Sequence, residues 1–234
     1  MVGNPVNTMR FQAGNQNATG SNAVFQVDEL RVGTVTTYSL WQPSRLDTAI
    51  ISNRTVLVDA VGQHAGILRL TNNATLNITN GWLSVADKFE IATGCTNLLQ
   101  LTGSLRVTNN LINNGTMRIT GAASLTVGGS FTNNGLLDVM TWSGSLPAGF
   151  VNTGTVLDRS LIRISSAKVN GLNFQATIQG YSGHNYQLQY RDDLTSGSRQ
   201  DIGASIPGAG SLITLIHTGG NTNQQRHYRV AVNP

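Results

Sequence analysis

A sequence unit of about 20 residues recurs through the middle of this chain, from about Asn53 to Asp158. Its best copies occupy residues 70–78, 112–119 and 131–139, which read LTNNATLNI, INNGTMRI and FTNNGLLDV. Weaker copies begin at Asn53, Thr93 and Asn152, so the spacing between successive copies stays close to 20 residues. A unit this short cannot bury an apolar face by itself, and neighbouring units must therefore stack into a solenoid.

The residues within each unit indicate short strands. Met117 and Ile119 alternate with Arg118 and Thr120, which is the period of a half-buried strand. We therefore expect an all-β fold whose main part is a parallel β-helix over residues 46–160. The helix should be right-handed, as parallel crossovers usually are. Coils stack at about 4.8 Å, so a core of about five to six coils is roughly 25 to 29 Å long.

Asparagine marks the corners of the repeat. Asn and Gly tolerate the left-handed backbone of tight corners, and stacked Asn amides can hydrogen-bond from coil to coil. We interpret these residues as structural corners rather than as catalytic groups or metal ligands. The four corner positions are Asn72, Asn113, Asn133 and Asn152.

The composition narrows the class of protein. Only 11% of the 234 residues are charged, and the net charge of +4 comes from 15 basic and 11 acidic residues. The basic residues form no cluster in the sequence, so we expect no nucleic-acid partner. The single cysteine, Cys95, excludes an internal disulfide, and no apolar run is long enough to span a membrane. Low charge with abundant Asn, Thr and Gly is common in extracellular β proteins.

Residues 1–45 form an N-terminal β segment and a connector. The stretch NAVFQVDELRVG at residues 22–33 resembles the last strands of laminin-G or concanavalin-like jelly rolls. Most of such a jelly roll is absent, and a short apolar strand pair must dock on another surface. The segment either caps the first coil of its own solenoid or adds to the sheet edge of a neighbouring molecule. The candidate contact residues are Val24, Phe25, Val27, Leu30 and Val32.

Residues 161–234 lose the 20-residue period and predict a small antiparallel β-sandwich. Phe174, Ala176 and Ile178 lie on one face of a predicted strand, and glycine-containing turns separate the strands. The stretches YQLQYRDDL and RHYRV resemble fibronectin-like C-terminal modules on large secreted proteins of Verrucomicrobia and related bacteria. The resemblance implies secretion or surface display and no reaction. The chain departs from that pattern at Arg199 and His227, where members usually carry Trp and Phe.

Few residues suggest chemistry. The chain has no nucleophile elbow, zinc-protease, Walker or dinucleotide fingerprint, so we expect no cofactor. The densest charged group is Asp87-Lys88-Phe89-Glu90, and we interpret it as a charged outer corner. The four histidines are scattered and predict no metal site.

Three functions remain open. The favoured hypothesis is a non-enzymatic extracellular or cell-surface structural protein, either a self-associating filament subunit or a stalk or adhesin module. The second is a carbohydrate-binding module that uses exposed aromatic residues, with Trp82, Trp142 and Tyr181 as candidates. The third is a polysaccharide lyase, since some lyases resemble this β-helical architecture; its candidate residues are Asp87 and Lys88.

Overall fold

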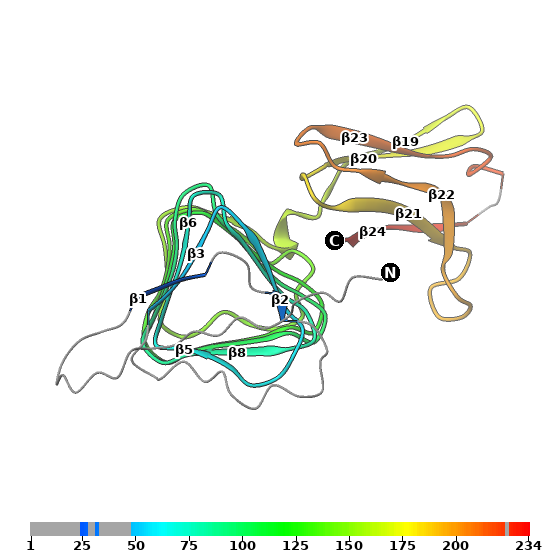
Figure 1. Ribbon diagram of the computed structural model, residues 1–234. Helices are drawn as coiled ribbons and strands as arrows, with labels where there is room; N and C mark the ends of the chain where they lie inside the picture. Colours follow the sequence, from blue (N-terminus) through cyan, green and yellow to red (C-terminus); the bar gives the residue numbers. More distant parts are fainter. Residues whose placement is uncertain (1–23, 28–30, 33–47, 223–224) are drawn as a thin grey trace, which may run out of the picture.

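The computed structural model of the chain describes residues 24–27, 31–32, 48–222 and 225–234. Within these residues the secondary structure is almost entirely β, and the single short helix is a 3-10 turn at Arg159–Leu161. Figure 1 shows a triangular solenoid, viewed down its axis, with a sandwich of antiparallel sheets beside it. The predicted fold class is therefore confirmed: a parallel β-solenoid followed by antiparallel sheets.

Three parallel sheets form the walls of the solenoid. Sheet A contains β1 (Val24–Val27), β3 (Thr48–Ser52), β6 (Ile67–Thr71), β9 (Lys88–Ile91), β12 (Asn110–Asn113), β15 (Phe131–Asn133) and β17 (Phe150–Asn152). Sheet B contains β2 (Arg31–Val32), β4 (Thr55–Val58), β7 (Thr75–Ile78), β10 (Thr96–Leu99), β13 (Thr116–Ile119), β16 (Leu136–Asp138) and β18 (Thr155–Leu157). Sheet C contains β5 (Gln63–Ala65), β8 (Trp82–Val85), β11 (Ser104–Val107) and β14 (Ser124–Val127).

The sequence period sets the register of these sheets. Thr75 pairs with Thr96, and Thr96 pairs with Thr116, so equivalent residues of successive repeats lie beside one another. About six coils follow one another at intervals of roughly 20 residues. Alternate side chains point inward and form one continuous core, in which Phe89 and Phe131 are fully buried. Cys95 is buried in the same core.

The N-terminal strands extend the solenoid of their own chain. β1 pairs in parallel with β3, with Val24 opposite Thr48, and β2 pairs in parallel with β4. Of the two alternatives for this segment, the structure shows the first, a cap on the first coil. Parallel pairing also differs from the antiparallel end of a jelly roll, so the resemblance to that fold finds no support here. Leu30 lies outside the described residues.

Two antiparallel sheets form the C-terminal sandwich. The first contains β19 (Ile164–Asn170), β20 (Asn173–Gln179) and β23 (Leu212–His217); the second contains β22 (Gln200–Pro207), β21 (Asn185–Arg191) and β24 (His227–Asn233). A second, smaller core lies between them, centred on Tyr186, Leu188 and Leu215. No helix in the described ranges is long and apolar enough to cross a membrane.

Candidate functional site

Three of the four corner asparagines form one column along the solenoid. The register aligns Asn113 with Asn133 and Asn133 with Asn152. Nδ2 of Asn113 donates to Oδ1 of Asn133 at 2.7 Å, and Nδ2 of Asn133 donates to Oδ1 of Asn152 at 2.7 Å. Asn113 and Asn133 are completely buried. These amides therefore point into the corner of the core, where the hydrogen bonds between coils satisfy most of their polar atoms.

The same amides tie sheet A to sheet B. Nδ2 of Asn113 also donates to the carbonyl of Leu136 at 3.0 Å, and Nδ2 of Asn133 donates to the carbonyl of Thr155 at 3.2 Å. The column ends at Asn113, whose buried Oδ1 has no partner. It ends there because the preceding coil places Ile91 at the equivalent position.

Asn72 has a different environment from the other three. In the coil that contains Asn72, the position equivalent to Asn113 is occupied by Leu70, because Leu70 pairs with Ile91 and Ile91 pairs with Asn113. Asn72 instead adopts a left-handed backbone with φ of 51° and donates to the hydroxyl of Ser52 at 2.9 Å. It is therefore a turn residue on the surface of the solenoid and does not belong to the buried column.

A buried charge cluster joins the solenoid to the sandwich. Asp138, at the end of β16, accepts hydrogen bonds from Nε of Arg118 and Nε2 of His184, both at 2.8 Å to Oδ2. The side chains of Asp138 and His184 are almost completely buried. Arg118 comes from the preceding coil, and His184 lies in the turn between β20 and β21. The carboxylate of Asp138 is thus shared by two coils and by the sandwich.

Arg118 makes a second set of contacts to the sandwich. Its Nη2 donates to the carbonyl of Ser182 at 3.2 Å, and its Nη1 donates to the carbonyl of Gly183 at 3.4 Å. Gly183 has a φ of +83°, and any Cβ at this position would collide with the guanidinium group. The turn therefore needs glycine both for its backbone conformation and for the close approach of Arg118.

The environment of Asp138 favours its ionised form. Burial raises the pKa of this carboxyl, but the hydrogen bond and charge of His184, the amide of Met140 and the charge of Arg118 outweigh burial. The folded-state pKa therefore lies below the ordinary value of 3.8. A depressed carboxyl pKa contributes stability that is complete above the ordinary value and is lost as the pH falls through the folded-state pKa.

The predicted charged corner at residues 87–90 is a set of surface pairs. Nζ of Lys88 lies 3.0 Å from Oε2 of Glu90, and Nε of Arg69 lies 3.5 Å from the same oxygen. Asp87 accepts a hydrogen bond from Asn109 at 2.9 Å. Each of these charged groups is partly exposed and has a partner on the same surface. The arrangement fits an ordinary charged corner, with no unpaired base directed into a cleft.

The aromatic residues considered for glycan binding lie in three different environments. Trp142 is buried, with 5% of its surface exposed, and its Nε1 donates to the carbonyl of Ala123 at 2.7 Å. It therefore cannot stack against a sugar ring at the surface. Trp82 is half-buried and packs edge-on against His64, with 4.9 Å between ring centroids. Tyr181 is also half-buried, and its amide donates to the hydroxyl of Tyr186.

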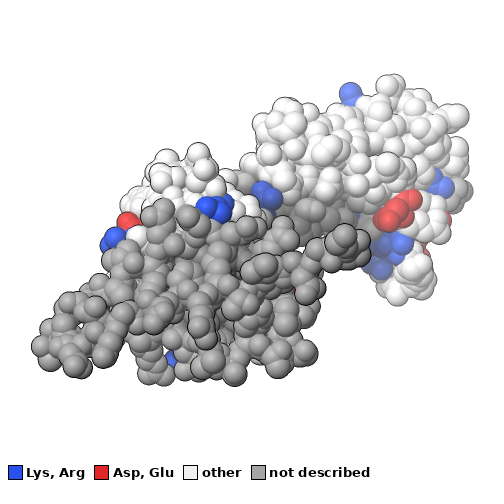
Figure 2. All heavy atoms as spheres, in the orientation of Figure 1, with Lys and Arg blue, Asp and Glu red and all other residues white. Residues whose placement is uncertain are grey.

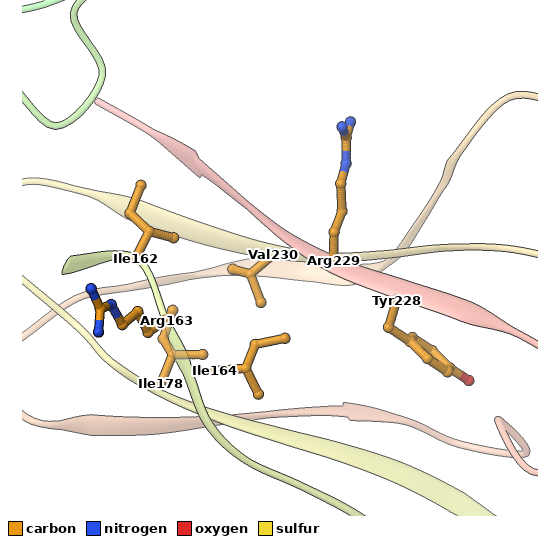
Figure 3. A pocket seen from close by; sticks show the side chains of 7 residues that line it. All are labelled: Ile162, Arg163, Ile164, Ile178, Tyr228, Arg229 and Val230. Atoms are coloured by element: carbon orange, nitrogen blue, oxygen red, sulfur yellow. The ribbon is translucent and has the colours of Figure 1, made fainter. Parts of the chain in front are cut away.

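A groove of about 340 Å³ opens at one edge of the sandwich, between the start of β19 and β24. Figure 3 shows Ile164, Ile178 and Val230 directed toward it, whereas Arg229 points away. All seven residues of β19, which is the edge strand of its sheet, are exposed. The groove is lined by aliphatic side chains together with Arg163, Tyr228 and Arg229, and it contains no pair of groups arranged for acid and base catalysis.

The remaining groups that could bind a metal are dispersed. Within the described ranges, no three His, Cys, Asp or Glu side chains converge on a point where an ion could be held. His184 is paired with Asp138, and Nδ1 of His217 lies 3.0 Å from the hydroxyl of Tyr228. Figure 2 shows how sparse the charged side chains are on the described part of the face in view.

Comparison with known proteins assigns no family. No protein-family model matches the chain, and neither the curated proteins nor the solved structures contain a match. The site must therefore be interpreted from its own geometry.

Sequence reasoning missed the cluster of Arg118, Asp138 and His184. One signal was present, since Arg118 and Asp138 are one repeat apart and the register places them side by side. His184 gave no signal, because it lies 46 residues beyond Asp138 in a region without the repeat. Only the docking of the sandwich brings it to the solenoid.

We predict that replacing Asn133 with Ala destabilises the protein by about 1–3 kcal/mol, because the change removes the buried hydrogen bonds of the Asn133 amide and one of the two acceptors of Asn113 Nδ2. Asn134→Ala is the matched control. Asn134 bonds to Asn114 in an exposed column, and its loss should change stability by only about 0.5 kcal/mol. Chemical denaturation measures both variants. Equal losses of stability in the two variants would show that burial of the asparagine column contributes nothing to the stability of the protein.

We predict that Asp138→Asn destabilises the protein by roughly 3 kcal/mol at neutral pH, because Arg118 and His184 lose a shared buried carboxylate. Glu90→Gln removes a carboxylate from a partly exposed cluster and should change stability by less than about 1 kcal/mol. Unfolding should be followed from pH 7 to pH 2. The wild type should lose stability below about pH 4 and Asp138→Asn should lose less, so parallel acid curves would exclude this role for Asp138.

Proposed function

We propose that the chain is a non-enzymatic structural protein of the extracellular space or cell surface, and that copies associate through the ends of their solenoids. The observation that carries the proposal is the open end of the coil stack. Within the described residues, sheet A ends at β17 and sheet B ends at β18, with no strand beyond either. Unpaired strand edges offer main-chain donors and acceptors to a second chain.

The side chains and shape of this end also favour contact with another molecule. Val151 in β17 is 52% exposed. A hollow of about 390 Å³ lies nearby and is partly lined by Val139, Trp142 and Leu146. An apolar side chain and an unfilled hollow beside two strand edges form a surface that another molecule can cover with a gain in buried area.

The sandwich leaves this route of assembly open. It attaches to the side of the solenoid, since Asp138 and Arg118 lie on sheet B and contact the turn at residues 182–184. Figure 1 shows the sandwich beside the triangle rather than across it. A contact between the two different ends of a rod is heterologous, and repeating it builds an open filament instead of a closed ring.

The N-terminal strands enter this scheme as one of the two ends. The candidate contact strand that includes Val24, Phe25 and Val27 pairs with β3 of its own chain. We therefore place the contact at the outer edges of β1 and β2, and we do not invoke a strand exchanged between copies. Under this scheme, β17 and β18 of one copy would pair with β1 and β2 of the next.

The carbohydrate-binding and lyase hypotheses receive less support from the same structure. Trp142 is buried, and the charged groups at residues 87–90 have partners on the surface. Neither observation provides a platform for a neutral sugar or a set of groups for bond cleavage. The structural role therefore remains the best-supported function.

The test is the state of association of a charged end variant. We predict that wild-type protein forms filaments or a ladder of oligomers as its concentration rises, and that Val151→Lys shifts it to monomers, because a charge in β17 opposes the addition of a strand. Electron microscopy and light scattering measure this. The control is Leu101→Lys, at an exposed position in the bend between β10 and β11, in the middle of the coil stack and away from both ends. Monomers of wild type at all concentrations, or equal effects of the two variants, would contradict the proposal.

A further inference from the structure

Three arginines gather on the outer face of the sandwich. Tyr186, Leu188 and Tyr228 contribute to the core, so the intervening residues of β21 and β24 face outward. The register places Arg191 opposite His227, and Gln189 opposite Arg229. Arg199 directly precedes β22, whose first residue, Gln200, pairs with Tyr190. Arg199 therefore lies beside Arg191, on the side of β21 away from β24. We call Arg191, Arg199 and Arg229 the arginine cluster.

None of these guanidinium groups is neutralised within the described part of the chain. The ion pairs of 4 Å or less in this part of the chain include none of the three arginines of the cluster. Nε of Arg229 donates to Oε1 of Gln189 at 2.7 Å, and Nη1 of Arg199 donates to the carbonyl of His227 at 3.5 Å. Nε of Arg191 is buried without a hydrogen-bond partner.

The neighbouring carboxylates are engaged by other groups. Asp201 accepts from Nε2 of Gln189 at 2.6 Å, and Asp192 accepts from Nε of Arg226 at 3.1 Å. Asp193 accepts from Thr195 and Ser196 in its own turn. Asp201 keeps its charge, because Gln189 is a neutral donor, and the register places it on the same face as the cluster. The cluster is still locally positive, because three guanidinium groups outnumber this one carboxylate on the face.

The three cations oppose one another. Partial desolvation and the charges of Arg191 and Arg229 lower the pKa of Arg199. Like charges held close together destabilise the folded state, and a bound anion relieves the repulsion. A planar guanidinium group also presents two parallel N–H donors, which match a carboxylate or sulfate oxygen pair.

We propose that the arginine cluster is a binding site for the carboxylate or sulfate groups of an acidic polysaccharide. An outer sheet face allows a long polymer to cross it without entering a pocket. The ring of Tyr190 packs at a tilt against those of His217 and Tyr228 on the opposite side of the sheet, so it provides no platform beside the cluster for nucleic-acid bases. A single group of three cations is also small for the extended phosphate contacts of a duplex.

The fold brings the side chain of Arg199 to the edge of β24, beside the rest of the cluster. Arg199 and His227 are 28 residues apart in the sequence, yet Nη1 of Arg199 bonds to the backbone of His227. Both positions lie at the cluster rather than in the sandwich core. The site is separate from the solenoid ends, so it adds a ligand to the proposed structural role without depending on self-association.

The experiment titrates the full chain with two acidic polysaccharides, polygalacturonate and dextran sulfate, and with neutral dextran. Calorimetry at low ionic strength should show binding to at least one acidic polymer and none to neutral dextran. Arg191→Gln and Arg229→Gln should each weaken binding about tenfold. Arg106→Gln is the matched control, since Arg106 is an exposed arginine on sheet C, and it should bind as the wild type does.

A second measurement separates binding from general damage to the fold. Arg199→Gln should raise the melting temperature in the absence of polymer, because it removes a repelling charge, and should reduce the further rise that the bound polymer produces. No binding to either acidic polymer, equal weakening by Arg106→Gln, or equal affinity for duplex DNA would overturn the proposal. The last result would indicate a non-specific response to negative charge.

Discussion

Parallel strand pairing at a nearly constant repeat length is the constraint on which the rest of the solenoid depends. Each coil must return to the same register for its backbone groups to bond to the coils on both sides. A change of one residue within a strand would exchange its inward and outward side chains. The repeat can vary in length only at the corners, and turn residues such as Asn72 and Asn73, both with positive φ, allow the chain to bend there.

The same constraint amplifies the effect of one side chain, because every position has a counterpart in the next coil. The position of Asn133 is occupied by Ile91 and Leu70 in earlier coils, so one corner of the core is aliphatic at the N-terminal end and polar at the C-terminal end. An aliphatic column needs no specific partner, whereas each buried amide needs one. The polar column therefore fixes its neighbours in place and ends at Asn113, where a carboxamide oxygen has no partner.

The sequence was sufficient to predict the solenoid, its approximate coil length and the following antiparallel sheets, because strand alternation and repeat length are local properties. It did not separate Asn72 from the buried column, since both environments favour asparagine in the same Asn-Asn pattern. It also left Trp142 as a candidate surface residue, although the loop after β16 carries this ring into the core. The pairing of Asp138 with His184 depends on how the two regions dock, and no local pattern carries that information.

The position of the charge cluster has a consequence for the whole molecule. A buried carboxylate that pairs with Arg118 and bonds to His184 has a preferred geometry, because any separation of the groups leaves an unpaired charge in a poorly solvated site. Asp138 therefore resists sliding of the sandwich along sheet B and holds it beside the fourth and fifth coils. A sandwich held at the side leaves the last strands of sheets A and B uncovered, and the arginine cluster lies on a sheet of the sandwich that is separate from those strands. One buried contact thus allows the proposed stacking surface and the proposed anion-binding surface to use different residues.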